Sequence, residues 1–115
     1  AKELAADAVI VLPDGIAIPQ MDAIAARASA LGLPTLGLND NELRLGLTFV
    51  LGSDRVQLWR EAAQTVDRLL RGAKIADLPF QQPTKVHIGV NVKAARALGL
   101  DVPFAIIARA DEVIE

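Results

Sequence analysis

The sequence has no cysteine, no tyrosine and a single histidine, and only 3% of its 115 residues are aromatic. Without cysteine there can be no disulfide framework, no thiol nucleophile and no cysteine metal site. One histidine leaves little material for imidazole catalysis or for a metal centre. We therefore expect neither a catalytic residue nor a metal or other cofactor.

Long apolar runs and basic clusters are also lacking. No stretch reaches the roughly 20 apolar residues that a membrane span needs, and the N-terminal AKELAADAV lacks the layout of a signal peptide. If the natural protein is exported, its signal lies outside this chain. The 12 Lys and Arg are scattered and the net charge is −2, so we expect no nucleic-acid partner.

Apolar residues are plentiful, at 52% of the chain, and the length suits a single domain, 1–115. Two explanations fit this excess. Either a parallel sheet is buried on both faces, or one surface is covered by something absent from the chain.

Apolar runs and helical periodicities alternate along the sequence. This alternation predicts an α/β fold with three layers, in which helices cover both faces of a mostly parallel sheet. Residues 8–12 read as a central strand buried on both faces. The other expected strands are 34–38, 47–51 and 86–90. The expected helices are 19–31, 42–45, 55–71, 92–98 and 103–110. Residues 2–6 read as the end of a helix, 74–83 as an extended connection and 111–115 as a charged tail.

Polar clusters follow two of the apolar runs. Asn39, Asp40 and Asn41 come after the second run, and Ser53 and Asp54 come after the third. In open α/β sheets, ligands bind beyond the carboxyl ends of the strands, so these clusters are candidate binding residues. The alternative is that they only cap helices and form turns, as Asn, Asp and Ser commonly do.

Two isolated side chains favour structural roles. Trp59 falls on the apolar face of the longest expected helix, together with Val56 and Val66, which predicts a core residue. His87 has no second His or Cys near it in sequence and reads as an ordinary strand histidine. The chain also lacks GxGxxG, GxxxxGK and GxSxG motifs and a metal-spaced His pair. Binding is therefore favoured over catalysis.

Several segments together resemble the C-terminal lobe of ABC-transporter substrate-binding proteins of the type that takes up tryptophan, tyrosine and other small solutes. The similar segments are ADAVIVLPDG, LGLPTLGLND, a Gly46…Gly52-Ser53-Asp54 spacing, LLRGAKIADLP, NVKAARALGLDVP and the ending ARADEVIE.

The resemblance implies a protein of two α/β lobes with ligand held between them and delivered to an ABC permease. It implies a flavodoxin-like lobe of a type I periplasmic binding protein, incomplete at its N-terminal side. Residues 1–78 would form its βαβαβα core, and 79–115 the strand returning from the hinge and the C-terminal helices. It further implies a small-molecule ligand, such as an amino acid, and a periplasmic or lipid-anchored extracytoplasmic location.

The resemblance also adds ligand-binding candidates after the first strand. The family usually has Asp-Asn-Thr there, and this chain has Asp14, Gly15 and Ile16. Asp14 matches the Asp of the family, but Gly15 and Ile16 replace its Asn and Thr, so two side chains that could hydrogen-bond a ligand are lost. At the next strand end Asn39 stands where the family favours Asp, and Arg55 and Val56 replace two aromatic positions after Asp54. These departures favour a more apolar or less cationic solute than an aromatic amino acid.

In the flavodoxin-like strand order, residues 8–12 would pair with a first strand that is missing here. An unpaired apolar edge is a template for another chain, so we expect a homodimer or higher oligomer.

Two other classes of function stay open. An effector-binding domain of a transcription regulator shares the two-lobe fold and would carry a DNA-binding head upstream. A small stand-alone α/β enzyme would need an acid–base pair around Asp14, Asn39 and Asp54.

Overall fold

The structure, a computed structural model, describes residues 5–80, 82–83 and 85–115. The chain divides into two compact units. Unit 1 is drawn from Ala1–Gly52 and His87–Glu115, and unit 2 is Ser53–Val86. The expected division of the domain at residue 78 stays a prediction. The expected helix end at residues 2–6 lies largely outside the described residues.

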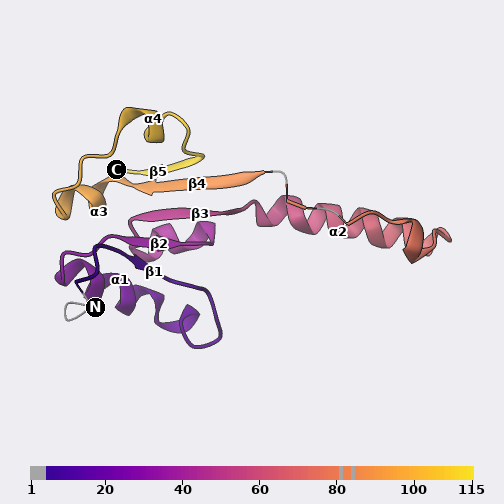
Figure 1. Cartoon of the computed structure of the whole chain (residues 1–115), viewed down its shortest axis with the longest axis horizontal. Helices are drawn as coiled ribbons and strands as arrows, with labels where there is room; N and C mark the ends of the chain where they lie inside the picture. The colour runs from indigo at the N-terminus through magenta and orange to yellow at the C-terminus, as the bar shows by residue number, and fades with distance from the viewer. Residues whose placement is uncertain (1–4, 81, 84) are drawn as a thin grey trace. The chain divides into compact units, whose positions relative to one another are not determined.

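Five strands form one sheet in the order β1-β2-β3-β4-β5 (Figure 1). The first three strands pair in parallel, and β4 and β5 also pair in parallel. The amide of Asn91 at the end of β4 donates to the carbonyl of Thr48 just before β3, which places these two strands antiparallel. The strands are β1 (Val9–Ile10), β2 (Thr35–Gly37), β3 (Phe49–Ser53), β4 (Val86–Asn91) and β5 (Glu112–Ile114).

The predicted α/β class with a mostly parallel sheet is confirmed, and each expected helix has a counterpart. Residues 111–115 were expected as a tail, but they contribute β5, and 74–83 contains one 3₁₀ turn. The helices are α1 (Met21–Ala30), α2 (Arg55–Leu70), α3 (Val92–Ala97) and α4 (Phe104–Ile107), with 3₁₀ helices η2 (Ile18–Gln20), η3 (Asp40–Leu45) and η4 (Ile75–Asp77).

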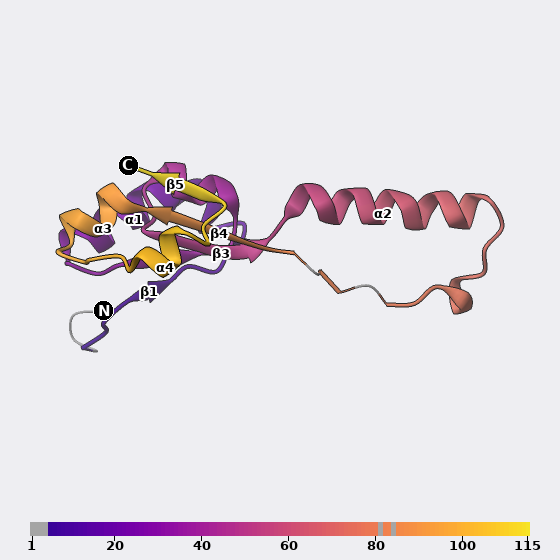
Figure 2. The same cartoon turned by 90° about the horizontal axis from the view of Figure 1, so that it is seen from above.

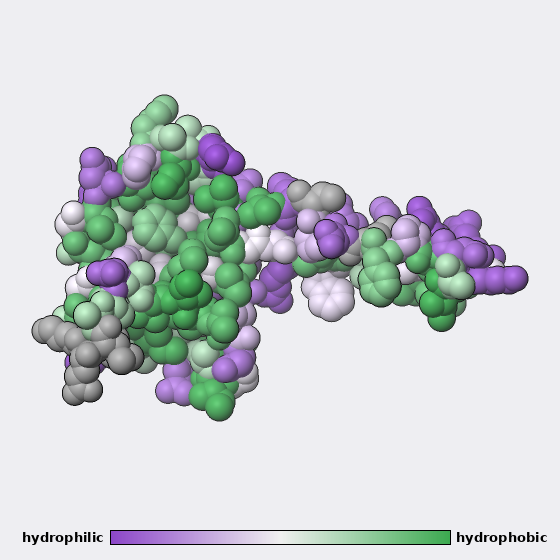
Figure 3. All heavy atoms as spheres, viewed as in Figure 1, coloured by the Kyte–Doolittle hydropathy of each residue, from purple (hydrophilic) through white to green (hydrophobic). Residues whose placement is uncertain are grey.

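The prediction that residues 8–12 form a central strand is wrong. β1 lies at the end of the strand order, and Ile10 and Leu12 are 63% and 67% exposed. A continuous apolar run is typical of a strand buried on both faces, but it specifies neither how many strands flank it nor whether the same chain covers both faces. Figure 3 shows hydrophobic residues gathered over unit 1, in keeping with these exposed side chains.

One part of the core of unit 1 joins α1 to the sheet. Val11, Met21, Ala25 and Leu47 form a buried cluster, and Val9, Ala17 and Ile24 pack against it. The α1 periodicity recognised in the sequence supplies Met21 and Ala25 from one helix face. Through Val11 and Ala17, these contacts hold the segment that follows β1 against α1.

Unit 2 consists of α2 and a return segment that runs back alongside the helix through η4 (Figure 2). No residue that the structure describes in this unit is buried. Trp59 is 72% exposed, so its prediction as a core residue is wrong. Amphipathic spacing correctly predicts an apolar helix face but not whether the same chain covers it.

Candidate functional site

The loop after β1 is organised by Asp14. Its Oδ1 accepts hydrogen bonds from the backbone amides of Ile16, at 2.8 Å, and Ala17, at 2.6 Å. These donors, Ala17 first, lower the pKa of Asp14, because they stabilise the ionised carboxylate. The following residues, Gly15 and Ile16, are exposed, the latter by 75%. The loop therefore presents a fixed negative charge beside an apolar side chain.

The loop after β2 is organised by Glu42, whose side chain is buried in a residue only 2% exposed. Oε2 accepts from the amides of Leu38, at 2.8 Å, and Asn39, at 3.1 Å, while Oε1 accepts from Asn39 Nδ2 at 2.6 Å. Three donors thus satisfy a buried carboxylate, as burial of a charge requires. The side-chain amide of Asn39 is engaged within the loop.

Sequence reasoning took Glu42 only as part of a helical turn and missed its role. The signal that could have found it is the Asn-x-x-Glu spacing of a capping box. Gly37 completes the arrangement, because a Cβ at that position would overlap the carboxylate oxygen Oε2 of Glu42. The neighbouring Asp40 accepts at Oδ1 from the amide of Asn41, at 3.0 Å, and remains exposed.

Because β1 and β2 are parallel neighbours, the loops that follow them lie at the same edge of the sheet. The structure therefore brings two of the predicted groups, Asp14–Ile16 and Asn39–Asp40, to one carboxyl edge of unit 1. Asp14 and Asp40 are exposed there, while Asn39 is half-buried. A hollow of about 200 Å³ lies beside Asp40 and is lined also by Asn41, Arg44 and Glu112.

The third predicted group, Ser53 and Asp54, begins unit 2. Asp54 caps α2 by accepting at Oδ1 from the amide of Gln57, at 3.0 Å, and its Oδ2 lies 3.2 Å from Lys85 Nζ. The Gln57 amide, followed by the Lys85 ammonium, lowers the pKa of Asp54. Both oxygens of this carboxylate therefore have partners within unit 2, and Ser53 is half-buried at the end of β3.

His87 lies on β4 with its Nδ1 3.9 Å from Asp111 Oδ2, and its Nε2 is buried with no hydrogen-bond partner among the described residues. That carboxylate oxygen already accepts from the amide of Ile88 at 2.9 Å. Across the described part of the chain, no group of three His, Asp or Glu side chains could hold a metal ion. No helix in the described ranges is long and apolar enough to cross a membrane.

Comparison with known proteins gives one family match. A family model described as "ABC transporter substrate binding protein" matches residues 2–114. A search of curated proteins found no match.

Three solved structures show the same fold. A conserved domain protein from Vibrio cholerae matches 94% of this chain at 25% identity and a TM-score of 0.82. An ABC domain from Streptococcus pneumoniae, solved in complex with L-Trp, matches 98% at 21% identity and a TM-score of 0.82. A ligand-free, open substrate-binding protein with adhesive properties from Clostridium difficile matches 92% at 20% identity and a TM-score of 0.69. The chain spans only 36%, 39% and 36% of these proteins, respectively.

Proposed function

Because the chain belongs to the family of ABC transporter substrate-binding proteins, we propose that it contributes one partial lobe to the solute-binding component of an importer. The family match over residues 2–114 is the observation that carries this proposal. In the complete protein, a small molecule would bind between two lobes and be delivered to an ABC permease. The protein would act outside the cytoplasm, in the periplasm or on a lipid anchor, and would have no catalytic activity.

The geometry of unit 1 supports a binding role for its carboxyl edge. The exposed Asp14 carboxylate suits an ammonium or hydroxyl group of a solute, and the exposed Ile16 beside it suits an apolar portion. Asn39 contributes less than its residue type suggests, because Glu42 holds its amide. We propose an amino acid or a similarly small solute as the ligand.

A thermal-shift screen of the chain against the common L-amino acids and other small solutes tests this function. The L-Trp complex of the similar Streptococcus pneumoniae domain makes L-Trp the first probe. We expect at least one solute to raise the melting temperature, since a ligand that binds only the folded state stabilises it. We expect Asp14→Ala to abolish that shift and Asp22→Ala, on the exposed surface of α1, to preserve it. No shift with any solute would contradict the proposal.

The open edge of β1 supports a second proposal, that the chain forms a homodimer or higher oligomer through strand pairing. Among the described strands β1 pairs only with β2, using the amides of Val9 and Val11, which donate to the carbonyls of Pro34 and Leu36 at 2.9 Å. The amide of Ile10 between them therefore faces the open edge. An unpaired edge of this kind can accept a strand from a second copy.

Light scattering at tens of micromolar tests the pairing. We expect a mass of at least two copies, and we expect Ile10→Pro to weaken the association, because proline removes the outward amide and leaves both bonds to β2. Ile10→Val is the matched control and should retain the wild-type mass. A wild-type monomer would contradict edge pairing.

A further inference from the structure

The backbone joins units 1 and 2 at two places, and both places lie at the ends of neighbouring strands. Unit 2 begins at Ser53, the last residue of β3, and ends at Val86, the first residue of β4. These two strands are neighbours in the sheet. The segment that enters unit 2 and the segment that leaves it therefore start from adjacent positions.

Asp54 and Lys85 tie these two segments together within unit 2. The amide of Asp54 donates to the carbonyl of Lys85 at 3.4 Å, and Lys85 Nζ donates to Asp54 Oδ2 at 3.2 Å. The other oxygen of the same carboxylate, Oδ1, accepts from the amide of Gln57 at 3.0 Å. One carboxylate thus fixes the entering segment, the first turn of α2 and the leaving segment to one another. The Asp54 and Lys85 side chains are 26% and 58% exposed, so we expect this ion pair to fix geometry more than to add stability.

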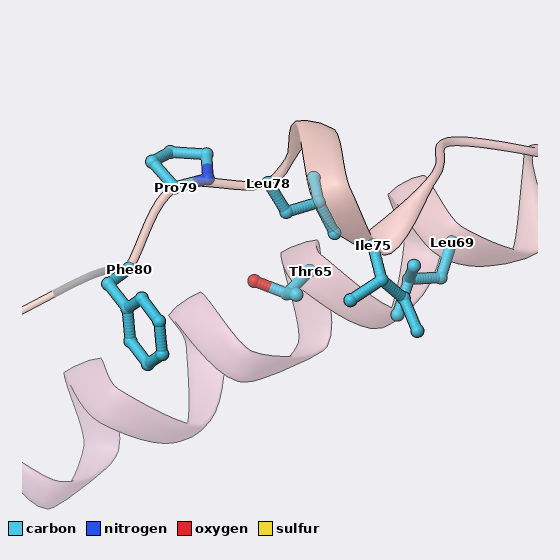
Figure 4. Close-up of a pocket in the computed structure, with 6 residues that line it drawn as sticks. All are labelled: Thr65, Leu69, Ile75, Leu78, Pro79 and Phe80. Carbon is cyan, nitrogen blue, oxygen red and sulfur yellow. The ribbon is translucent and has the colours of Figure 1, made fainter.

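Further along unit 2, α2 and the return segment are held together by other side chains. Six residues from the two segments line a hollow of about 380 Å³ (Figure 4): Thr65, Leu69, Ile75, Leu78, Pro79 and Phe80. The two that belong to α2, Thr65 and Leu69, are half-buried. This part of unit 2 does not involve Asp54 or Lys85. Loss of the Lys85 ammonium should therefore loosen the two connecting segments without unfolding the rest of the unit.

We propose that Asp54 and Lys85 form a clasp, which makes the two connections between units 1 and 2 bend together as a single hinge. Two separate connections could each rotate about their own backbone torsions, because hinge motion is absorbed by a few residues at the ends of elements. Segments tied by a backbone hydrogen bond and an ion pair lose that independence. Asp54 and Lys85 are positioning residues in this role, and the role goes beyond solute binding, since no solute is needed for the clasp to act.

Distances between the two units test the clasp, and the absence of cysteine allows labels at chosen positions. Ser29→Cys on α1 and Gln64→Cys on α2 place a nitroxide at one exposed position of each unit. Excess unlabelled chain removes signals between copies, and pulsed electron paramagnetic resonance then gives the distribution of distances. We expect a narrow distribution for the otherwise unchanged chain. Lys85→Met keeps the aliphatic stem without the ammonium and should widen the distribution about twofold, because the number of independently bending connections rises from one to two.

Three further variants separate the clasp from a general effect of lost charge. Asp54→Asn keeps a helix cap but not the carboxylate, and should widen the distribution as Lys85→Met does. Lys85→Arg keeps the cation and should preserve the narrow distribution. Arg71→Met is the matched control, because it breaks another ion pair of unit 2, in which Arg71 Nε lies 2.9 Å from Asp67 Oδ2, and it should change nothing.

Three results would overturn the proposal: a distribution that is already wide with Lys85 in place, one that Lys85→Met and Asp54→Asn leave unchanged, or one that Lys85→Arg widens as much as Lys85→Met. Because these measurements use the chain without any solute, they succeed or fail separately from the solute screen.

Discussion

Glu42 and Asn39 are joined by a hydrogen bond of 2.6 Å from the side-chain amide of Asn39 to Oε1 of the Glu42 carboxylate. Asn39 was selected from the sequence as a ligand-binding residue, and the structure gives its amide a partner inside the protein. The loop after β2 is therefore built around a buried carboxylate. The same hydrogen bond that stabilises this loop also occupies the side-chain amide of Asn39, which is then not free to bind a ligand.

Replacing Glu42 with Gln tests how much this carboxylate stabilises unit 1. The uncharged amide keeps the shape but has one acceptor oxygen in place of two, so either the backbone amides of Leu38 and Asn39 or the side-chain amide of Asn39 lose their acceptor. We expect a loss of about 1–3 kcal/mol in the free energy of unfolding, measured by urea denaturation. Glu61→Gln, on the helix surface of α2, should stay within about 0.5 kcal/mol. Equal effects of the two variants would show that the buried carboxylate has no special role.

Gly37 and Gly15 provide a pair of matched alanine substitutions. A Cβ on Gly37 would overlap Glu42 Oε2 and come within 2.6 Å of Leu47 Cδ2, whereas a Cβ on Gly15 would meet nothing within 4 Å. We expect Gly37→Ala to destabilise the fold by about 1–3 kcal/mol, since the buried loop must shift, and Gly15→Ala to be nearly neutral. Thermal unfolding of both variants measures the difference, and a neutral Gly37→Ala would refute the packing around Glu42.

Asn91 joins the end of β4 to the start of α3. Its Oδ1 accepts from the amide of Ala94 at 2.9 Å, and its Nδ2 donates to the carbonyl of Leu43 at 3.4 Å, at a position only 9% exposed. We expect Asn91→Ala to cost about 1–2 kcal/mol through loss of the helix cap. Asn91→Ser retains a capping acceptor without turning a charge toward the Leu43 carbonyl, and should cost less in a chemical denaturation series. A larger loss for Ser than for Ala would contradict the assigned cap.

Acid should destabilise the chain through Asp14 and Asp54, whose pKa values are both lowered from the ordinary aspartate value of 3.8. A group with a lower pKa in the folded state than in the unfolded state binds fewer protons when folded. Its stabilisation is complete above the unfolded pKa and is lost as the pH falls through the folded pKa. We expect Asp14→Asn to reduce this acid-dependent loss of stability in unfolding curves from pH 6 to pH 2. Parallel curves for Asp14→Asn and wild type would contradict the bonding found at the loop after β1.

The sequence predicted local structure well, because its signals are local. The expected helix starts at residues 55 and 92 match α2 and α3, which Asp54 and Asn91 cap by accepting from the amides of Gln57 and Ala94. The resemblance to substrate-binding proteins was confirmed by the match over residues 2–114. Local periodicity could not give the number of neighbours of β1 or the exposure of Trp59, because both depend on which surfaces meet in three dimensions.

The candidate site was predictable only in part for the same reason. Polar residues after β1 and β2 were found from strand ends, and the parallel pairing of those strands brings their loops to one edge. Which polar atoms remain available could not be predicted, since Glu42 is distinguished from other acidic residues by its burial. The ligand-binding roles of Asp14, Gly15, Ile16, Asn39, Asp40, Ser53 and Asp54 stay predictions.

The most direct measurement is a titration of isotope-labelled chain with the solute that gives the largest thermal shift, followed by amide chemical shifts. Chemical shifts also detect the weak binding expected when a chain spans only part of a family domain. We expect the largest changes at the amides of Gly15, Ile16 and Asp40, beyond the carboxyl ends of β1 and β2. Changes confined to other surfaces, or none at saturating solute, would contradict a binding role for this edge of the sheet.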